Sequence, residues 1–140
     1  MDAPTTPSLH VCPGDSFLVP PTDPARIRNS PLGLSSDYYR RLLIFDGSGR
    51  TWRVEDVRTD RGVTFLDRLL RKTLNARLVC RAAPDVEMQQ VVDELCSIVD
   101  SDSDDLYNQF VSHNELKRLF RSARSPGELI EVARRLGDAG

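Results

Sequence analysis

Prolines divide this chain of 140 residues into two unequal parts. Seven of the nine prolines lie within residues 1–36, at positions 4, 7, 13, 20, 21, 24 and 31. Because proline fixes φ and removes a backbone donor, long helices and central strands are expected mainly after this segment. Apolar residues in 1–36 are scattered singly, which is typical of a disordered or loosely docked arm. The alternative is a partner-binding strand built on Phe17, Leu18 and Val19.

One folded domain is expected behind this arm. The chain carries 19 basic and 21 acidic residues, a formal charge of −2, and its length suits a single modest domain. No apolar run approaches the roughly 18 residues of a membrane-spanning helix, and the first residues lack the basic and apolar regions of a secretion signal. Cys12, Cys80 and Cys96 are widely spaced, which fits a reducing compartment. We therefore expect a cytoplasmic protein with no membrane partner.

Residues 37–82 have the pattern of two strands, a helix and a third strand. An apolar run over 38–45, turn residues over 46–49 and a second apolar pattern over 51–58 predict a β-hairpin, with a bulge or strand end near Glu55 and Asp56. Residues 76–82 alternate apolar side chains with arginine, as in a third strand. Between the second and third strands, helical spacing of apolar residues predicts a helix over about 63–74: Phe65, Leu66, Leu69, Leu70 and Leu74.

Helices are expected over the rest of the chain. An apolar stripe after Pro84 predicts a long amphipathic helix that contains Met88 and Val99. Three short helices should follow, around residues 106–111, 116–123 and 129–136, and capping-box sequences at 112–115 and 125–128 open the last two. The predicted fold class is therefore α+β. It has a ββαβα core within 37–103 and a C-terminal appendix of three short helices over 104–140, packed on the core or tethered to it.

The sequence shows no constellation of residues for catalysis or metal binding. The acids at 100, 102 and 104 alternate like the start of a calcium loop, but the positions that need Gly and Glu hold Asp105 and Val111. Neither His10 nor His113 has a cysteine or a second histidine at ligand spacing. The turn at 47–49 lacks the pattern of a nucleophile elbow and the lysine of a phosphate loop. We expect a non-catalytic protein with no cofactor and no metal.

Charge is divided unevenly along the chain. Residues 37–81 carry eleven basic and six acidic side chains, whereas residues 82–118 carry two basic and nine acidic. One interpretation is a basic sheet that packs beside acidic helices. Another is a face that binds single-stranded nucleic acid, because rings beside guanidinium groups are typical of such proteins. Its residues are Tyr38, Tyr39, Arg40, Arg41, Arg50, Trp52 and Arg53. The competing interpretation places Trp52 and one of the tyrosines in the core.

A stretch near the C-terminus has features of a known helical domain. It runs over about 104–137 and contains Phe110, the sequence Asn-Glu-Leu at 114–116, RSARSPGEL at 121–129 and ARRLG at 133–137. This stretch resembles the nitrogen-fixation-associated helical leader-peptide domain of bacterial modified-peptide precursors. In that family a core peptide usually follows the domain, whereas residues 138–140 follow it here. The resemblance therefore implies a bacterial setting and a helical surface that another protein recognises, rather than a substrate.

These observations together predict a small bacterial protein-binding or adaptor module, of the kind found in peptide-modification or toxin-immunity systems. Its partner is expected to be a protein that contacts the outer face of the last helix, which carries Glu128, Glu131, Arg134 and Arg135. The alternative function is a single-stranded nucleic-acid-binding module that uses the arginine and aromatic hairpin.

Overall fold

The computed structural model describes residues 3–13, 21–35, 37–84, 86–101 and 112–139, with side chains described as far as residue 135. Five antiparallel strands form one sheet in the order β1-β3-β4-β5-β2. Their bounds are β1 Leu9–Val11, β2 Ile27–Asn29, β3 Leu43–Phe45, β4 Thr51–Thr59 and β5 Leu74–Ala82.

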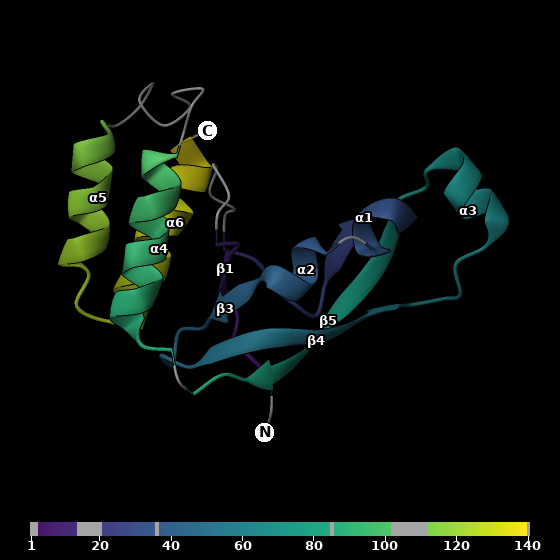
Figure 1. The fold of residues 1–140 in the computed structure, drawn as a ribbon, viewed down its shortest axis with the longest axis horizontal. Helices are drawn as coiled ribbons and strands as arrows, with labels where there is room; N and C mark the ends of the chain where they lie inside the picture. The colour runs from purple at the N-terminus through teal and green to yellow at the C-terminus, as the bar shows by residue number, and fades with distance from the viewer. Residues whose placement is uncertain (1–2, 14–20, 36, 85, 102–111, 140) are drawn as a thin grey trace.

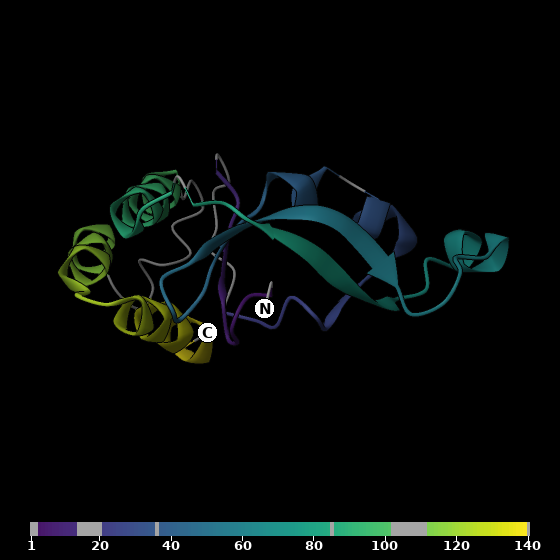
Figure 2. The same ribbon diagram turned by 90° about the horizontal axis from the view of Figure 1, so that it is seen from below.

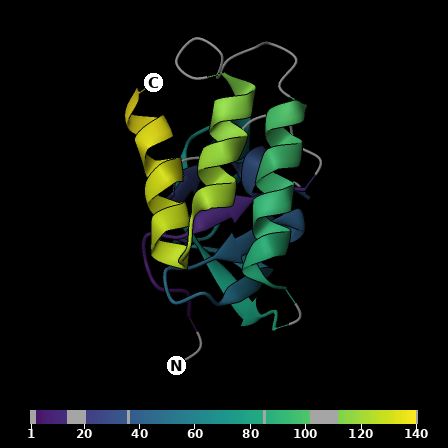
Figure 3. The same ribbon diagram turned by 90° about the vertical axis from the view of Figure 1, so that its left-hand side faces the viewer.

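Six helices in these ranges complete the fold: α1 Pro31–Ser35, α2 Tyr38–Arg41, α3 Phe65–Leu70, α4 Met88–Asp100, α5 His113–Ser122 and α6 Pro126–Ala139. The helices α4, α5 and α6 gather at one end of the molecule, whereas α3 lies at the opposite end of the long β4–β5 ribbon, where it contacts α1 (Figures 1 and 2). Figure 3 shows the three helices side by side across that end. The α+β class is confirmed, and so is the ββαβα order from β3 to α4.

Hydrophobic residues form one cluster on each face of the sheet. The strand β3 takes part in both clusters because all three of its residues are apolar, as in strands that are covered on both faces. Leu43 and Phe45 pack with the helices α4 to α6, including Phe120, which is 0% exposed. Ile44 belongs to the second cluster, where Trp52 lies with side chains from α1 and α2.

A buried carboxylate organises the turn between β3 and β4. Asp46 accepts hydrogen bonds from the backbone nitrogens of Thr5 (3.2 Å), Ser48 (3.0 Å) and Arg50 (3.1 Å), and from Nε1 of Trp52 (2.9 Å). Burial acts to raise the pKa of Asp46, but its hydrogen bonds, led by those from the Ser48 hydroxyl (2.6 Å) and the Trp52 indole, outweigh burial and lower the pKa below its ordinary value. The carboxylate therefore holds the turn and an N-terminal segment together.

The proline-rich segment 1–36 is part of the sheet in its described residues, which corrects the prediction of a disordered or loosely docked arm before a domain that begins at 37. The strand β1 pairs with β3, and β2 pairs with β5, so this segment supplies both edges of the sheet. Prolines flank these strands and do not interrupt them, and each strand needs only three residues because a neighbouring strand completes its hydrogen bonds. The alternative strand at 17–19 lies outside the described residues.

The predicted strand over 38–45 is wrong in its first half. Tyr38–Arg41 forms the short helix α2, and only Leu43–Phe45 pairs with β4. The helix places Tyr39 in the second cluster, and Leu42 then adopts an extended conformation (φ −65°, ψ 137°) that leads into the strand. A dense apolar run is compatible with either a strand or a helix. The packing of its side chains therefore decides which of the two forms.

Other predicted elements are confirmed with adjusted bounds. The register between β4 and β5 shifts between Val54 and Asp56, as expected for the bulge. The predicted helix over 63–74 covers only Phe65–Leu70. Of the three short helices, the first lies outside the described residues, and the other two are α5 and α6. These two helices share one core with β1, β3 and α4, so they are part of the main domain.

Candidate functional site

The aromatic residues proposed for nucleic-acid binding lie mostly in the core. Trp52 is 2% exposed and donates its indole hydrogen to Asp46, and Tyr39 is 7% exposed with its hydroxyl 3.0 Å from Nδ2 of Asn29. Tyr38 is half-buried, with its ring edge-on to that of Tyr39. The core interpretation of Trp52 and one tyrosine is confirmed. Neither the Trp52 ring nor the Tyr39 ring can stack on a base in the folded protein.

The four arginines of the same hypothesis do not share one hairpin surface. Arg40 and Arg41 lie on α2, whereas Arg50 precedes β4 and Arg53 lies within it. Arg53 is half-buried and the other three are exposed. The nucleic-acid hypothesis placed residues 38–41 in a strand, which would have put the four arginines on one hairpin. Because these residues form the helix α2, the arginines do not lie along one hairpin.

The structure places all four residues of the sequence-predicted protein contact on α6. Glu128 and Arg134 are exposed, as is Arg135, while Glu131 is half-buried. Glu131 forms ion pairs with Arg134 and, at 3.6 Å, with Arg135, and Glu128 accepts a hydrogen bond from the backbone of Arg124 at 2.8 Å. These charges therefore partly satisfy each other. The assignment of α6 as a contact surface stays a prediction.

Reactive groups in the described residues are buried or half-buried. Oγ of Ser8 lies 3.3 Å from Nε2 of His10, but Ser8 is 0% exposed and its hydroxyl also donates to the backbone of Thr22. Burial lowers the pKa of His10 to about 4, against the opposing effect of Asp23. Burial likewise raises the pKa of the Cys80 thiol to about 11. No group of three or more His, Cys, Asp or Glu residues in the described ranges could hold a metal ion.

The exposed apolar surface gathers at α3, which sequence reasoning did not single out. Every large hydrophobic residue that is exposed in the described part of the chain belongs to α3, to Val63 just before it, or to Leu32 on α1. We call these six residues the α3 patch: Leu32, Val63, Phe65, Leu66, Leu69 and Leu70. Phe65 is 77% exposed and Leu69 is 64% exposed. A cluster of this kind marks an interaction site more often than scattered surface leucines do.

Polar contacts hold α3 in place while its apolar residues face solvent. Asp67 is the buried residue of this helix. It accepts two hydrogen bonds from Arg61 (2.6 and 2.7 Å) and one from the backbone of Thr64 (2.9 Å), while the Thr64 hydroxyl accepts from the backbone of Asp67. Hydrogen bonds from Arg61 and Thr64 hold the pKa of Asp67 far below its ordinary value, so the carboxylate stays ionised. Arg71, in the left-handed region at φ 52°, ends the helix.

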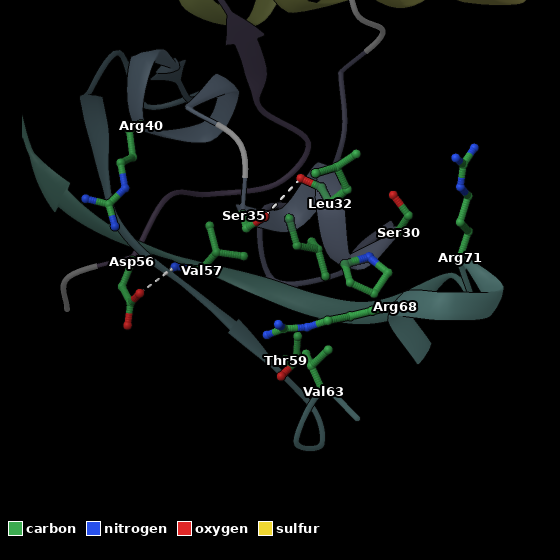
Figure 4. Close-up of a pocket in the computed structure, with 12 residues that line it drawn as sticks. Ser30, Leu32, Ser35, Arg40, Asp56, Val57, Thr59, Val63, Arg68 and Arg71 are labelled. Atoms are coloured by element: carbon green, nitrogen blue, oxygen red, sulfur yellow. Dashed lines mark hydrogen bonds between the residues drawn. The ribbon is translucent and has the colours of Figure 1, made fainter. Parts of the chain in front are cut away.

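A groove of about 980 Å³ lies between α1 and the β4–α3 segment. Its apolar wall consists of Pro31, Leu32, Leu34, Val57 and Val63, and it continues into the α3 patch through Leu32 and Val63. Arg40, Arg68 and Arg71 also line it. Figure 4 shows Arg68 lying along the groove, with Arg40 toward one end and Arg71 toward the other. A concave apolar surface with a few charged groups has the general form of a binding site.

The pairing of β4 with β5 explains why the α3 patch is exposed. The strands over 51–59 and 74–82 pair with each other along their length, so residues 60–73 must lie beyond the end of the ribbon. A helix at such a place has few neighbours against which to bury an apolar face. Helical spacing alone indicates a shared face but does not say what covers it.

No family model, curated protein or solved structure matches the chain. No helix in the described ranges is long and apolar enough to cross a membrane.

Proposed function

We propose that this chain is a non-catalytic protein-binding module that docks its partner through the α3 patch. The observation that carries the proposal is the gathering of all described exposed large hydrophobic residues at one projecting end of the molecule. Four large apolar side chains of α3 are exposed to water, so they do not contribute the free energy of burial that the apolar side chains of α4 to α6 contribute. A partner that covers them would recover it.

The geometry of α3 favours insertion into a groove on a partner. Phe65, Leu66, Leu69 and Leu70 follow the spacing of a short helical ligand, in which residues one turn apart anchor the contact. The capping box and the ion pair between Arg61 and Asp67 fix the helix before binding, which lowers the entropy lost on association. The α3 patch is therefore pre-formed.

We place this module in the bacterial cytoplasm, as an adaptor in a peptide-modification or toxin-immunity system. The support for this setting is the resemblance of residues 104–137 to the helical leader-peptide domain, together with cysteine usage that fits a reducing compartment.

The test compares capture of proteins from a bacterial lysate by the wild type and by the double variant Leu66→Ser with Leu69→Ser. We expect the variant to retain its fold, because both side chains are exposed, and to lose at least tenfold in recovery of the partner. The double variant Gln89→Ser with Asp93→Ser on the exposed face of α4 is the matched control, and it should recover the partner at the wild-type level. Undiminished recovery by the α3 variant would reject this docking surface.

A further inference from the structure

We propose that the groove between α1 and the β4–α3 segment binds an acidic, partly apolar peptide segment of the protein partner. This inference rests on the proposed function, since it names the part of the partner that lies beside the α3 patch. The groove volume of about 980 Å³ is at the upper end of ligand sites and has room for several side chains.

The apolar wall of the groove comes from three separate parts of the chain. Pro31 and Leu34 come from α1, whereas Val57 comes from β4 and Val63 from the segment before α3. Leu32, 80% exposed, stands at the junction of the groove and the α3 patch. A ligand that fills the groove can therefore bury apolar side chains and remain in contact with the patch.

The charged side chains of the groove are mainly cationic. Arg40, Arg68 and Arg71 line the groove, and none of them has a carboxylate partner among the described residues. The single acidic residue in the lining is Asp56, which accepts from the backbone of Val57 at 2.9 Å and faces Arg58 at 3.4 Å. Three guanidinium groups thus remain to pair with carboxylates, which they bind in a planar, bidentate manner.

Each hydroxyl group of the groove makes a hydrogen bond within the chain. Ser30 accepts from the backbone of Gly33, Ser35 donates to the carbonyl of Leu32, and Thr59 donates to the carbonyl of Arg61. The arginines and the apolar wall therefore contribute most to the selection of a ligand.

A second copy of this chain does not fit as the occupant. The only exposed large apolar surface that a copy could offer, among the described residues, is the same patch, flanked by the same cations at Arg68, Arg71 and Lys72. Bringing two such patches together would oppose like charges. Nucleic acid is disfavoured because no aromatic ring of the described residues lines the groove. An anionic membrane can meet the projecting α3 patch, but a flat bilayer surface cannot fill the concave groove along which Arg68 lies (Figure 4).

The experiment measures fluorescence anisotropy of a labelled twelve-residue peptide composed of glutamate, leucine and phenylalanine, with the full chain as titrant. A second peptide replaces every glutamate with lysine, and a third replaces leucine and phenylalanine with serine. We expect the first peptide to bind best, with an affinity that falls as salt is raised. Each of the other two should bind at least tenfold more weakly.

Charge-reversal variants locate the contact. Arg68→Glu with Arg71→Glu should weaken binding of the acidic peptide at least tenfold. The matched control, Arg77→Glu with Arg81→Glu, reverses two exposed arginines of β5 that do not line the groove, changes the net charge equally and should leave binding unchanged. Equal losses in both variants, or equal binding of the lysine peptide, would overturn the proposal.

Sedimentation with vesicles of phosphatidylserine separates the membrane alternative. Binding to vesicles without binding to the acidic peptide would also overturn the proposal. If partner recovery depends on Leu66 and Leu69 but the peptide does not bind, the inference about the groove fails and the proposed function stands. If the peptide binds but recovery is insensitive to the α3 variant, the assignment of the α3 patch fails instead.

Discussion

The two ends of the molecule use leucine-rich helices in opposite ways. In the layer formed by α4, α5 and α6, Leu116, Phe120 and Leu129 are each 0% exposed. In α3, Phe65 and Leu69 are mostly exposed, and the buried residue is the carboxylate Asp67. The difference shows that amphipathic spacing creates a face, whereas the elements around the helix decide whether solvent or protein meets it.

The neighbours of each helix explain this difference. The helix α4 contacts both α5 and β1, and α5 also contacts α6, so each can bury its apolar stripe. The helix α3 has six residues, too few to be stable alone, and although it contacts α1, its four large apolar side chains remain exposed. Its stability must come from the capping box and from Arg61, since its leucines contribute little in the unbound state.

The sharpest test of this comparison substitutes one phenylalanine at each end. Phe120→Ala removes a side chain that is 0% exposed, so it should lower the free energy of unfolding by about 3–5 kcal/mol. Phe65→Ala removes a side chain that is 77% exposed and should change it by no more than about 0.5 kcal/mol. Urea denaturation measures both. Similar losses for the two variants would show that α3 is packed in solution and would remove the basis of the proposed docking surface.

The sheet and α3 should also respond differently to acid. His10 on β1 is buried, and its pKa is lowered from 6.5 to about 4, so the folded state favours the neutral ring. Between these two values the unfolded chain binds more protons than the folded chain, and stability must fall as pH falls. The expected loss from His10 between pH 7 and pH 4 is about 3 kcal/mol. At α3, by contrast, Asp67 stays ionised throughout this range, so the helix cap is retained.

Denaturation at a series of pH values in the wild type and in His10→Gln tests this expectation. The variant should lose most of the decrease in stability between pH 7 and pH 4. His113→Gln is the matched control, because it removes the other histidine from a helix outside the sheet, and it should keep the wild-type decrease. If His10→Gln also keeps that decrease, a different group causes it.

The sequence predicted elements correctly where a local pattern of residues is compatible with a single way of packing. The stripe from Met88 to Val99 could only bury itself against other elements, and α4 does so. Ser112 and Ser125 each accept a hydrogen bond from the predicted backbone nitrogen, at 3.2 Å in both cases, whereas the carboxylates of Glu115 and Glu128 bind Arg118 and the backbone of Arg124 instead of reaching back to the cap. The bulge beside Glu55 followed from the phase of the apolar residues in β4.

Prediction failed where the outcome depended on distant contacts. The apolar run that contains Tyr39 could be strand or helix, and its place in the second cluster selected the helix. Residues 9–11 and 27–29 show no strand pattern of their own, because an edge strand of three residues takes its conformation from its neighbour. The α3 patch was missed for the same reason, since exposure is a property of what surrounds a helix.

The smallest expected effect concerns α6, where sequence reasoning placed the partner. Reversing all four charges, with Glu128→Lys, Glu131→Lys, Arg134→Glu and Arg135→Glu, keeps the net charge and allows the exposed ion pairs to re-form with opposite sign. The melting temperature should fall only slightly, mainly because a lysine at position 128 opposes the dipole at the helix start.

We expect this reversed α6 variant to recover the protein partner as well as the wild type does, because the proposed docking surface lies at the opposite end of the molecule. Recovery from lysate, run beside the α3 variant Leu66→Ser with Leu69→Ser, measures the contrast. In the described part of α6, Leu129, Ile130 and Ala133 are buried, so the surface there offers mainly exposed charges, which contribute little binding free energy at the edge of an interface. Loss of the partner from the α6 variant, with recovery intact in the α3 variant, would return the interface to Glu128, Glu131, Arg134 and Arg135.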